Sequence, residues 1–239
     1  MFKNIPISAL IGLFFTGLYF FIAIFAPWIA PYGMADAVGD VWEPASAKHW
    51  LGTDSIGRDL LSRMIYGGRT TIFIATAATV LSFTLGSCLG LLAAVMGGWV
   101  DQAISRFVDL IMSIPSLIFA LVVLSVMPVT IPVLILVMGL LDSTRVYRLS
   151  RAVAVDINVM DYVEAAKLRG EKLGWIMRKE ILPNIMPPLI AEFGLRFSFV
   201  FLTIAALSFL GFGIQPPTAD WINKGTPAWA RIRRGCRRP

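Results

Sequence analysis

The sequence predicts an all-α, polytopic membrane protein. Hydrophobic residues make up 57% of its 239 residues and charged residues only 15%, whereas a soluble domain carries charge on about a quarter of its residues. One span could not raise the average so far, and about five apolar runs are long enough to cross a bilayer. Lipid offers backbone groups no hydrogen-bond partners, and the runs lack long β alternation, so the spans must be helices.

The side chains available for chemistry exclude most enzyme classes. The two cysteines, Cys88 and Cys236, make neither a disulfide framework nor a metal cluster, and the single histidine, His49, is expected on the surface of a loop. The sequence contains no Gly-rich phosphate loop, no His-Glu-x-x-His zinc motif and no plausible catalytic triad. We therefore expect no enzyme activity and no cofactor. A protein of this kind that moves a solute uphill must take energy from a partner or an ion gradient.

The first span is predicted at residues 5–30, behind Lys3. The run is too long and too aromatic for a cleaved signal peptide. Pro27 and Pro31 are expected to break the helix near its far end.

A polar loop follows at residues 31–70. Gly52-Thr53-Asp54 and Gly57 are typical of turns, and Arg58 to Tyr66 has the pattern of a short amphipathic helix. We interpret this loop as a scaffold packed on the outer face of the protein.

The second span, residues 71–97, carries small residues at every fourth position. Such a face lets two helix backbones approach closely. Whether the neighbouring helix belongs to this chain or to a partner stays open at this point. The ladder consists of Ala78, Ser82, Gly86, Gly90 and Ala94.

The third span, residues 104–126, contains Asp109 and Pro115. An ionisable residue in a span is a functional candidate by default. Arg106, three residues earlier, can pair with Asp109 near the membrane surface, which explains the charge without a transport role.

Two further spans are predicted at residues 131–149 and 189–212. The last one begins after Pro187-Pro188 and contains Glu192 and Arg196. These two residues are four apart on a helix, so they can form an ion pair that lowers the cost of both charges in the membrane.

A polar hairpin separates these last two spans, at residues 161–183. Asp161 is predicted to cap a first helix, with Glu164 completing an Asp-x-x-Glu capping box. Gly170 is predicted to end this helix and reverse the chain.

The second arm of the hairpin is predicted from about Lys172 to Leu182, with Pro183 ending it. A helix–turn–helix of this size is too short to be a domain, and its obvious use is to be held by another protein. The alternative is an amphipathic anchor on the anionic leaflet of the membrane. The cationic residues that favour the anchor are Lys167, Arg169, Lys172, Arg178 and Lys179.

The distribution of Lys and Arg sets the orientation, because cytoplasmic segments carry the excess. With the N-terminus inside, the cytoplasmic segments hold Lys3, Arg106 and eight residues from Arg145 to Lys179, ten in all. The opposite side, without the tail, holds four: Lys48, Arg58, Arg63 and Arg69. The hairpin is therefore predicted to be cytoplasmic.

The hairpin resembles the EAA loop of permease subunits in binding-protein-dependent ABC importers, where this loop docks into a groove on the cytoplasmic ATPase. The resemblance implies that small residues at 165 and 166 permit close approach and that the glycine at 170 lets the chain reverse. The residues that match, and that the resemblance implies for ATPase coupling, are Glu164, Ala165, Ala166, Gly170, Ile181, Leu182 and Pro183.

Two other segments resemble the dipeptide, oligopeptide and nickel branch of that family, His49 to Arg69 and Leu207 to Pro217. The resemblance implies a type I importer permease with six spans in a bacterial inner membrane, carrying peptides or nickel. It also implies a second homologous permease, two cytoplasmic ATPase subunits and a periplasmic or lipid-anchored solute-binding protein as partners. Membrane lipid is expected around the chain, and nothing indicates nucleic acid.

The C-terminus departs from this pattern. Residues 1–221 are interpreted as one transmembrane domain, and residues 222–239 as an aberrant basic tail that makes the chain look truncated. After an odd number of spans such a tail would lie outside, against the positive-inside bias. The alternatives are a non-functional truncated permease, a secondary transporter, or a membrane scaffold with an interfacial hairpin. A secondary transporter would show mid-span acids or internal repeats, which we do not find in the sequence.

Overall fold

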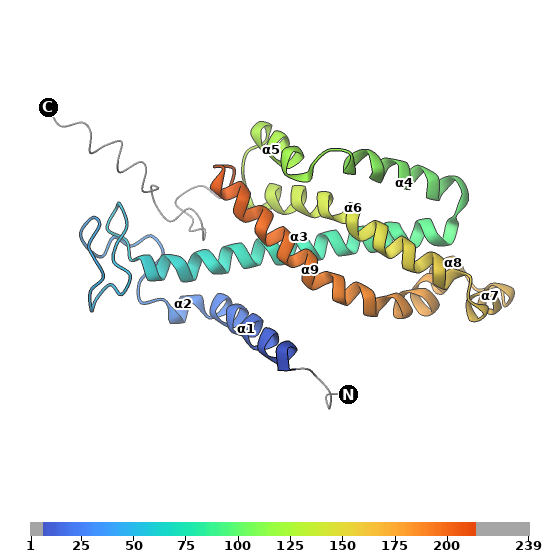
Figure 1. The fold of residues 1–239 in the computed structure, drawn as a ribbon, viewed down its shortest axis with the longest axis horizontal. Coiled ribbons are helices and arrows are strands. Elements are labelled where there is room, and N and C mark those ends of the chain that lie inside the picture. The colour runs from blue at the N-terminus through green and yellow to red at the C-terminus, as the bar shows by residue number, and fades with distance from the viewer. Residues whose placement is uncertain (1–6, 214–239) are drawn as a thin grey trace. The chain divides into compact units, whose positions relative to one another are not determined.

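The computed structural model describes residues 7–213, and α-helices are their dominant regular structure (Figure 1). This confirms the all-α prediction. The basic tail at 222–239 lies outside the described residues. The helices are α1 (Ile7–Ile24), α2 (Ala26–Ile29), α3 (Leu60–Met96), α4 (Gly98–Met112), α5 (Ser116–Val126), α6 (Ile131–Asn158), α7 (Asp161–Leu168), α8 (Leu173–Ile176), the π-helix η1 (Met177–Ile181) and α9 (Leu182–Phe209).

The predicted spans coincide with helices, but with different limits. Among the described residues, Leu60–Met96 and Leu173–Phe209 are each long and apolar enough to cross a membrane, and the pair α4–α5 adds a third if it is one span. The apolar part of α1, Ala9–Ile24, is shorter. The helix α6 covers the predicted fourth span and continues to residue 158. The described residues form two compact units, one of residues 7–73 with 204–213 and one of 74–203.

In the first unit, the loop before α3 is built on a buried carboxylate. Asp54 accepts hydrogen bonds from the Nε atom of Arg58 at 2.9 Å and the Nη1 atom of Arg63 at 3.1 Å. The backbone N–H groups of Ile56 and Arg58 donate to its other oxygen. Burial alone would raise the pKa of Asp54, but these hydrogen bonds and the Arg58 charge hold it below its usual value.

A second carboxylate, Asp59, begins α3. Its Oδ2 atom accepts from the N–H and the hydroxyl of Ser62, both at 2.8 Å, as a helix cap does. The predicted amphipathic helix at 58–66 is therefore the first part of α3, because Asp59 starts the long helix there. His49 lies 3.2 Å from Asp59 and is only 3% exposed. The prediction of a surface histidine was wrong, since the loop folds over this pair.

In the second unit, the ladder of small residues on α3 packs against α6 of the same chain. A Cβ atom on Gly86 would lie 2.6 Å from the backbone oxygen of Ser143. One on Gly90 would lie 2.9 Å from the backbone nitrogen of Arg151. Such distances exclude a side chain, so the two glycines set how closely the helices approach. The structure thereby answers the question that the sequence left open.

The predicted third span is broken. Helices α4 and α5 meet at 81°, with residues 113–115 between them. Pro115 explains the break, because its ring cannot continue a helix from the preceding residues. Asp109 pairs with Arg148 of α6 at 2.7 Å, which corrects the predicted pairing with Arg106. The partner is on the facing helix because α4 packs along α6.

The last span begins earlier than predicted. Helix α9 starts at Leu182 and holds Pro187 and Pro188 inside it. The fixed φ of proline suits a helix even though its N–H group is lost. Ile185 and Leu189, on either side of the prolines, are buried in a hydrophobic cluster that anchors this part of the helix.

We predict that Asp54→Asn destabilises the first unit by about 3–5 kcal/mol, because it leaves buried arginines without their counter-charge. Thermal unfolding of the purified protein in detergent measures this. Asp40→Asn makes the same charge change at an exposed site and should have little effect. The pKa of Asp54 is lower in the folded protein than in the unfolded chain. Ionised Asp54 therefore adds to the free energy of unfolding above the ordinary pKa of an aspartate, and this stabilisation is lost as the pH falls below that value. An Asp54→Asn variant as stable as the parent would contradict the network.

A second prediction concerns the contact between α3 and α6. Gly86→Ala should destabilise the protein by about 1–3 kcal/mol, because the added methyl group meets backbone atoms that cannot move aside. Gly194→Ala is the matched control, since a Cβ atom there meets nothing within 4 Å. Replacing glycine by alanine raises the helix propensity by the same amount at both positions. The difference between the melting temperatures of the two variants therefore isolates the packing effect. Equal melting temperatures would refute the close contact.

Candidate functional site

The hairpin at residues 161–183 begins with α7. Its N-cap is Met160, and no side chain caps the helix. The predicted capping box is therefore wrong: Asp161 is already the first helical residue, so its carboxylate cannot cap from the residue before the helix. Asp161 and Glu164 instead lie in the first turn, where negative charge is favoured by the helix dipole.

The reversal at Gly170 is confirmed. Gly170 has a φ of +78°, a conformation that favours glycine. Its N–H group donates to the oxygen of Lys167 at 3.0 Å, and the N–H of Glu171 donates to the oxygen of Ala166 at 3.3 Å. These two bonds form a Schellman motif, which ends a helix and turns the chain.

The second arm was predicted to end at Pro183, but the helix continues through it. Helix α8 starts at Leu173, passes through the π-turn of η1 and continues into α9. In the π-turn, the N–H of Leu182 donates to Met177 five residues earlier. We attribute the continuation to this wider turn, which moves the hydrogen-bond register just before the proline and so accommodates its missing N–H group.

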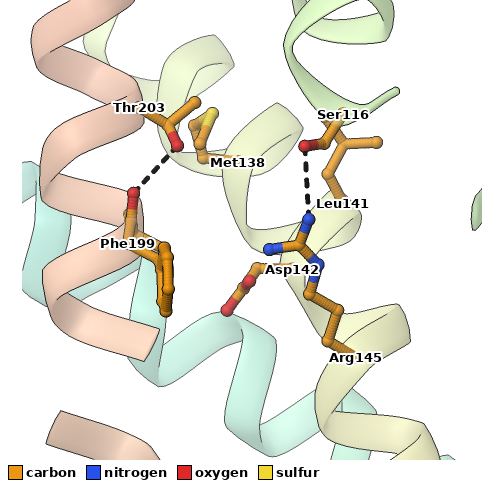
Figure 2. A pocket seen from close by; sticks show the side chains of 8 residues that line it. Ser116, Met138, Leu141, Asp142, Arg145, Phe199 and Thr203 are labelled. Carbon is orange, nitrogen blue, oxygen red and sulfur yellow. Dashed lines mark hydrogen bonds between the residues drawn. The ribbon is translucent and has the colours of Figure 1, made fainter. Parts of the chain in front are cut away.

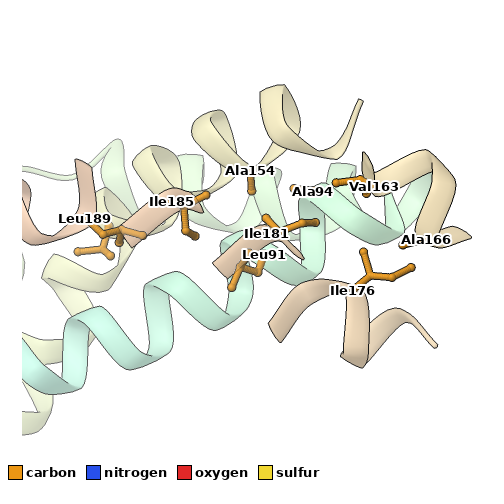
Figure 3. Packing of buried hydrophobic residues seen from close by; sticks show 10 residues of the cluster. Leu91, Ala94, Ala154, Val163, Ala166, Ile176, Ile181, Ile185 and Leu189 are labelled. Atoms are coloured by element: carbon orange, nitrogen blue, oxygen red, sulfur yellow. The ribbon is translucent and has the colours of Figure 1, made fainter. Parts of the chain in front are cut away.

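The inner face of the hairpin packs on the ends of the long helices. Figure 3 shows side chains of the hairpin interleaved with those of α3, α6 and α9 in one apolar cluster. A displacement of the hairpin must therefore move these helices with it, because close-packed interiors transmit displacement. The buried members of the cluster are Leu91, Ala94, Val146, Ala154, Val163, Ala166, Ile176, Ile181, Ile185 and Leu189.

The seven residues implied for coupling divide between the two faces of the hairpin. Ala166 and Ile181 are fully buried in the cluster, and Leu182 packs against it. All three hold the hairpin to the long helices, and Ala166 and Ile181 have no surface for a partner. The exposed residues are Glu164, Ala165, Gly170 and Pro183.

Sequence reasoning missed the apolar part of the outer face. The side chain of Leu168 is 83% exposed, and Leu173 and Tyr162 are also exposed. Leu168 and Leu173 flank the reversal at Gly170, which was a usable signal, because residues at the tip of a hairpin cannot reach its core. Two of the basic residues are engaged within the chain: Lys167 donates to the Asn158 side chain at 3.0 Å, and Arg169 lies 3.9 Å from Glu180.

A second candidate site is a small pocket between α5, α6 and α9, lined by both polar and apolar side chains (Figure 2). Asp142 of α6 is 7% exposed and lies 3.7 Å from the Nη1 atom of Arg196 on α9. Arg196 also donates to Glu192 at 2.5 Å, which confirms the predicted pair. Arg145 donates to the hydroxyl of Ser116 at 3.5 Å.

The sequence did not single out Asp142. It lies in the span predicted at residues 131–149, directly after an apolar run, so it met the same criterion as Asp109. Its pairing with Arg196 crosses 54 positions of sequence (196 − 142) and could not be seen before the helices were assembled. Asp142 and Glu192 both lie beside Arg196. Within residues 7–213, no three His, Cys, Asp or Glu side chains gather as a metal site would require.

Comparison with known proteins identifies the family of the chain. Residues 86–230 match the family model of the binding-protein-dependent transport system inner membrane component. Residues 8–41 match the N-terminal TM domain of oligopeptide transport permease C.

Curated relatives cover most of the chain. The di/tripeptide transport system permease protein of Pseudomonas aeruginosa is 38% identical over 221 residues, which is 90% of this chain and 73% of that protein. The dipeptide transport system permease protein of Escherichia coli K12 is 42% identical over 222 residues, 90% of this chain and 74% of that protein. The Alkalihalophilus pseudofirmus dipeptide permease is 32% identical over 89% of this chain and 70% of its own length. The chain belongs to the family of inner-membrane components of binding-protein-dependent transport systems.

Proposed function

We propose that this chain is a permease subunit of a peptide importer, forms half of the translocation path and is driven by a separate ATPase through residues 161–183. The observation that carries the proposal is the two-sided hairpin. Its inner face is fixed in the cluster with α3, α6 and α9, and its outer face presents Leu168 among charged residues.

This geometry suits the transmission of force. A partner that moves α7 acts on Val163 and Ala166, which contact the ends of the long helices in the cluster. The hairpin is therefore a rigid extension of the spans, and ATP-driven movement of the partner would tilt the helices. An exposed leucine inside a charged rim has the composition of a protein contact, with an apolar centre and polar surroundings.

The alternative of a hairpin lying on the lipid surface fits less well. An interfacial helix buries its apolar face in the leaflet, but Val163, Ile176 and Ile181 are turned into the protein cluster. Lys167 is bound to Asn158 and Arg169 is near Glu180, so part of the positive charge is already compensated within the chain.

Further subunits are supported by charged side chains on the long helices. Arg145 of α6 is exposed in the described chain, whereas the exposed Arg148 and Asp109 compensate each other as an ion pair. Charges directed into lipid would be costly, whereas charges that face a pathway or a partner are common in transporters. We infer a second homologous permease on this side, two ATPase subunits at the hairpins and an extracytoplasmic solute-binding protein.

The names of the relatives support a peptide as the solute. The three relatives described above are named as permeases for dipeptides or tripeptides, and none of the three is named for nickel. The identity of the peptide rests largely with the solute-binding protein.

We predict that Glu164→Arg lowers ATP-coupled peptide uptake at least about tenfold, because a reversed charge in a contact surface costs several kcal/mol. Gly170→Pro should abolish uptake, since proline cannot adopt the positive φ that Gly170 has. Uptake is measured in membrane vesicles with all partner subunits, and the amount of inserted permease is measured in parallel. Asp156→Arg makes the same reversal on α6, outside the hairpin, and is the control. Normal uptake by both hairpin variants would refute the coupling role.

The orientation generates another prediction. In a chain with both native cysteines replaced by serine, a cysteine at Lys172 should react with an impermeant thiol reagent only from the cytoplasmic side. A cysteine at Ala47 should react only from the other side, following the excess of Lys and Arg. Both positions are exposed, so the reagent can reach them. Reversed labelling would contradict the topology and the docking proposal together.

A further inference from the structure

The pocket beside Asp142 lies on α6, the helix that covers the predicted fourth span. Asp142 is 11 residues after Ile131, the first residue of α6 (142 − 131). An ionisable residue in a span is costly and is a functional candidate by default.

One oxygen of Asp142 lacks a partner. The Oδ1 atom lies 3.7 Å from Arg196, but the Oδ2 atom is buried and has no hydrogen-bond partner. Figure 2 shows the carboxylate in the space that separates Phe199 from the Arg145 guanidinium. A buried acceptor without a donor destabilises a protein, and more so when it is charged. Such an atom in a native structure calls for an explanation, and a functional role is one of them.

The surroundings define the chemistry of that ligand. The charged groups around Asp142 are Arg145 on its own helix and Glu192 and Arg196 on α9. Its neutral polar neighbours are Ser116 of α5 and the buried Ser82 of α3, whose hydroxyl donates to the backbone oxygen of Thr79. The two acids and two arginines balance, so an additional lone ion would unbalance the cluster. A zwitterion would not, because it brings one positive and one negative group.

The size of the pocket sets which part of the ligand enters it. The partly open pocket has a volume of about 20 Å³, which accommodates one water-sized group. A protonated amino group has that size and carries three donors, and an ionised carboxylate only accepts hydrogen bonds. Arg145 is exposed at the rim, where it can meet a negative group outside the pocket.

We propose that the Oδ2 atom of Asp142 accepts a hydrogen bond from the protonated α-amino group of a peptide during its passage through the membrane. The inference rests on the proposed function and names the group of the substrate that the path recognises. A charge-assisted hydrogen bond is roughly twice as strong as a neutral one. Asp142 thus favours peptides with a free, charged N-terminus and compensates the charge of that amino group in the membrane.

The test measures uptake of a dipeptide with a free N-terminus by the complete transporter in proteoliposomes, between pH 6.5 and 9. The α-amino group loses its proton near pH 7.7–8.0. At pH 6.5, Asp142→Asn should lower uptake about tenfold, the equivalent of about 1.4 kcal/mol. At pH 9 the parent and the variant should approach each other, because the substrate no longer carries the charge that Asp142 recognises. The parent and the variant use the same binding protein and ATPase. The ratio of variant uptake to parent uptake therefore reports the membrane step alone.

Three further variants make the result specific. Asp142→Glu keeps the charge and should retain the pH-dependent advantage over Asp142→Asn. Asp142→Ser removes the charge with a smaller side chain and should repeat the Asp142→Asn result, even if the asparagine variant assembles poorly. Asp109→Asn makes the same charge change at an exposed ion pair and should give a ratio that does not vary with pH.

The inference is overturned if the ratio of variant uptake to parent uptake stays constant with pH for both Asp142→Asn and Asp142→Ser. A structural role of Asp142, or a water molecule bound to it, would not depend on the protonation of the substrate. That outcome leaves the proposed function intact. A parent transporter that takes up no peptide at any pH would instead overturn the proposed function and this inference together.

Discussion

Close contact between α3 and α6 is the constraint on which the second unit depends. Gly86 and Gly90 allow the backbone of α6 to approach α3 to a distance that a side chain would prevent. This contact places Val146 and Ala154 beside Leu91 and Ala94, where the hairpin completes the apolar cluster. In lipid there is no hydrophobic force between apolar helices, so dense packing at small residues has to supply the attraction.

The hairpin then acts as a part of the helices that cross the membrane. The residues that match the family's coupling motif divide between two environments. Ala166 and Ile181 are buried and attach the hairpin to the long helices, whereas Glu164 is exposed. The Schellman turn at Gly170 fixes the angle between the arms without using any side chain. A short segment can therefore present a defined surface and still transmit movement.

Charged side chains on the long helices are held in pairs between helices. Arg148 joins α6 to α4 through Asp109, Arg151 does so through Asp101, and Arg196 joins α9 to α6 through Asp142. Pairing lowers the cost of each charge in the membrane. Asp142 is the exception, because one of its oxygens stays without a partner in the described structure. Asp142 therefore both joins two helices and keeps an acceptor to spare.

The sequence by itself determined the helical membrane class, the family resemblance, the reversal at Gly170 and the pairing of Glu192 with Arg196. These depend on composition, on turn chemistry or on residues four apart, all of which are local properties. Only the tertiary structure decided that Asp109 pairs with Arg148, that His49 is buried against Asp59, and that Asp142 meets Arg196. The reason is physical: hydropathy shows that a segment is a helix, but the partner of a charge depends on which helix faces meet, and packing decides that after the helices have formed. Pro183 illustrates the same limit, because the π-turn just before it lets the helix continue where the residue alone predicts an end.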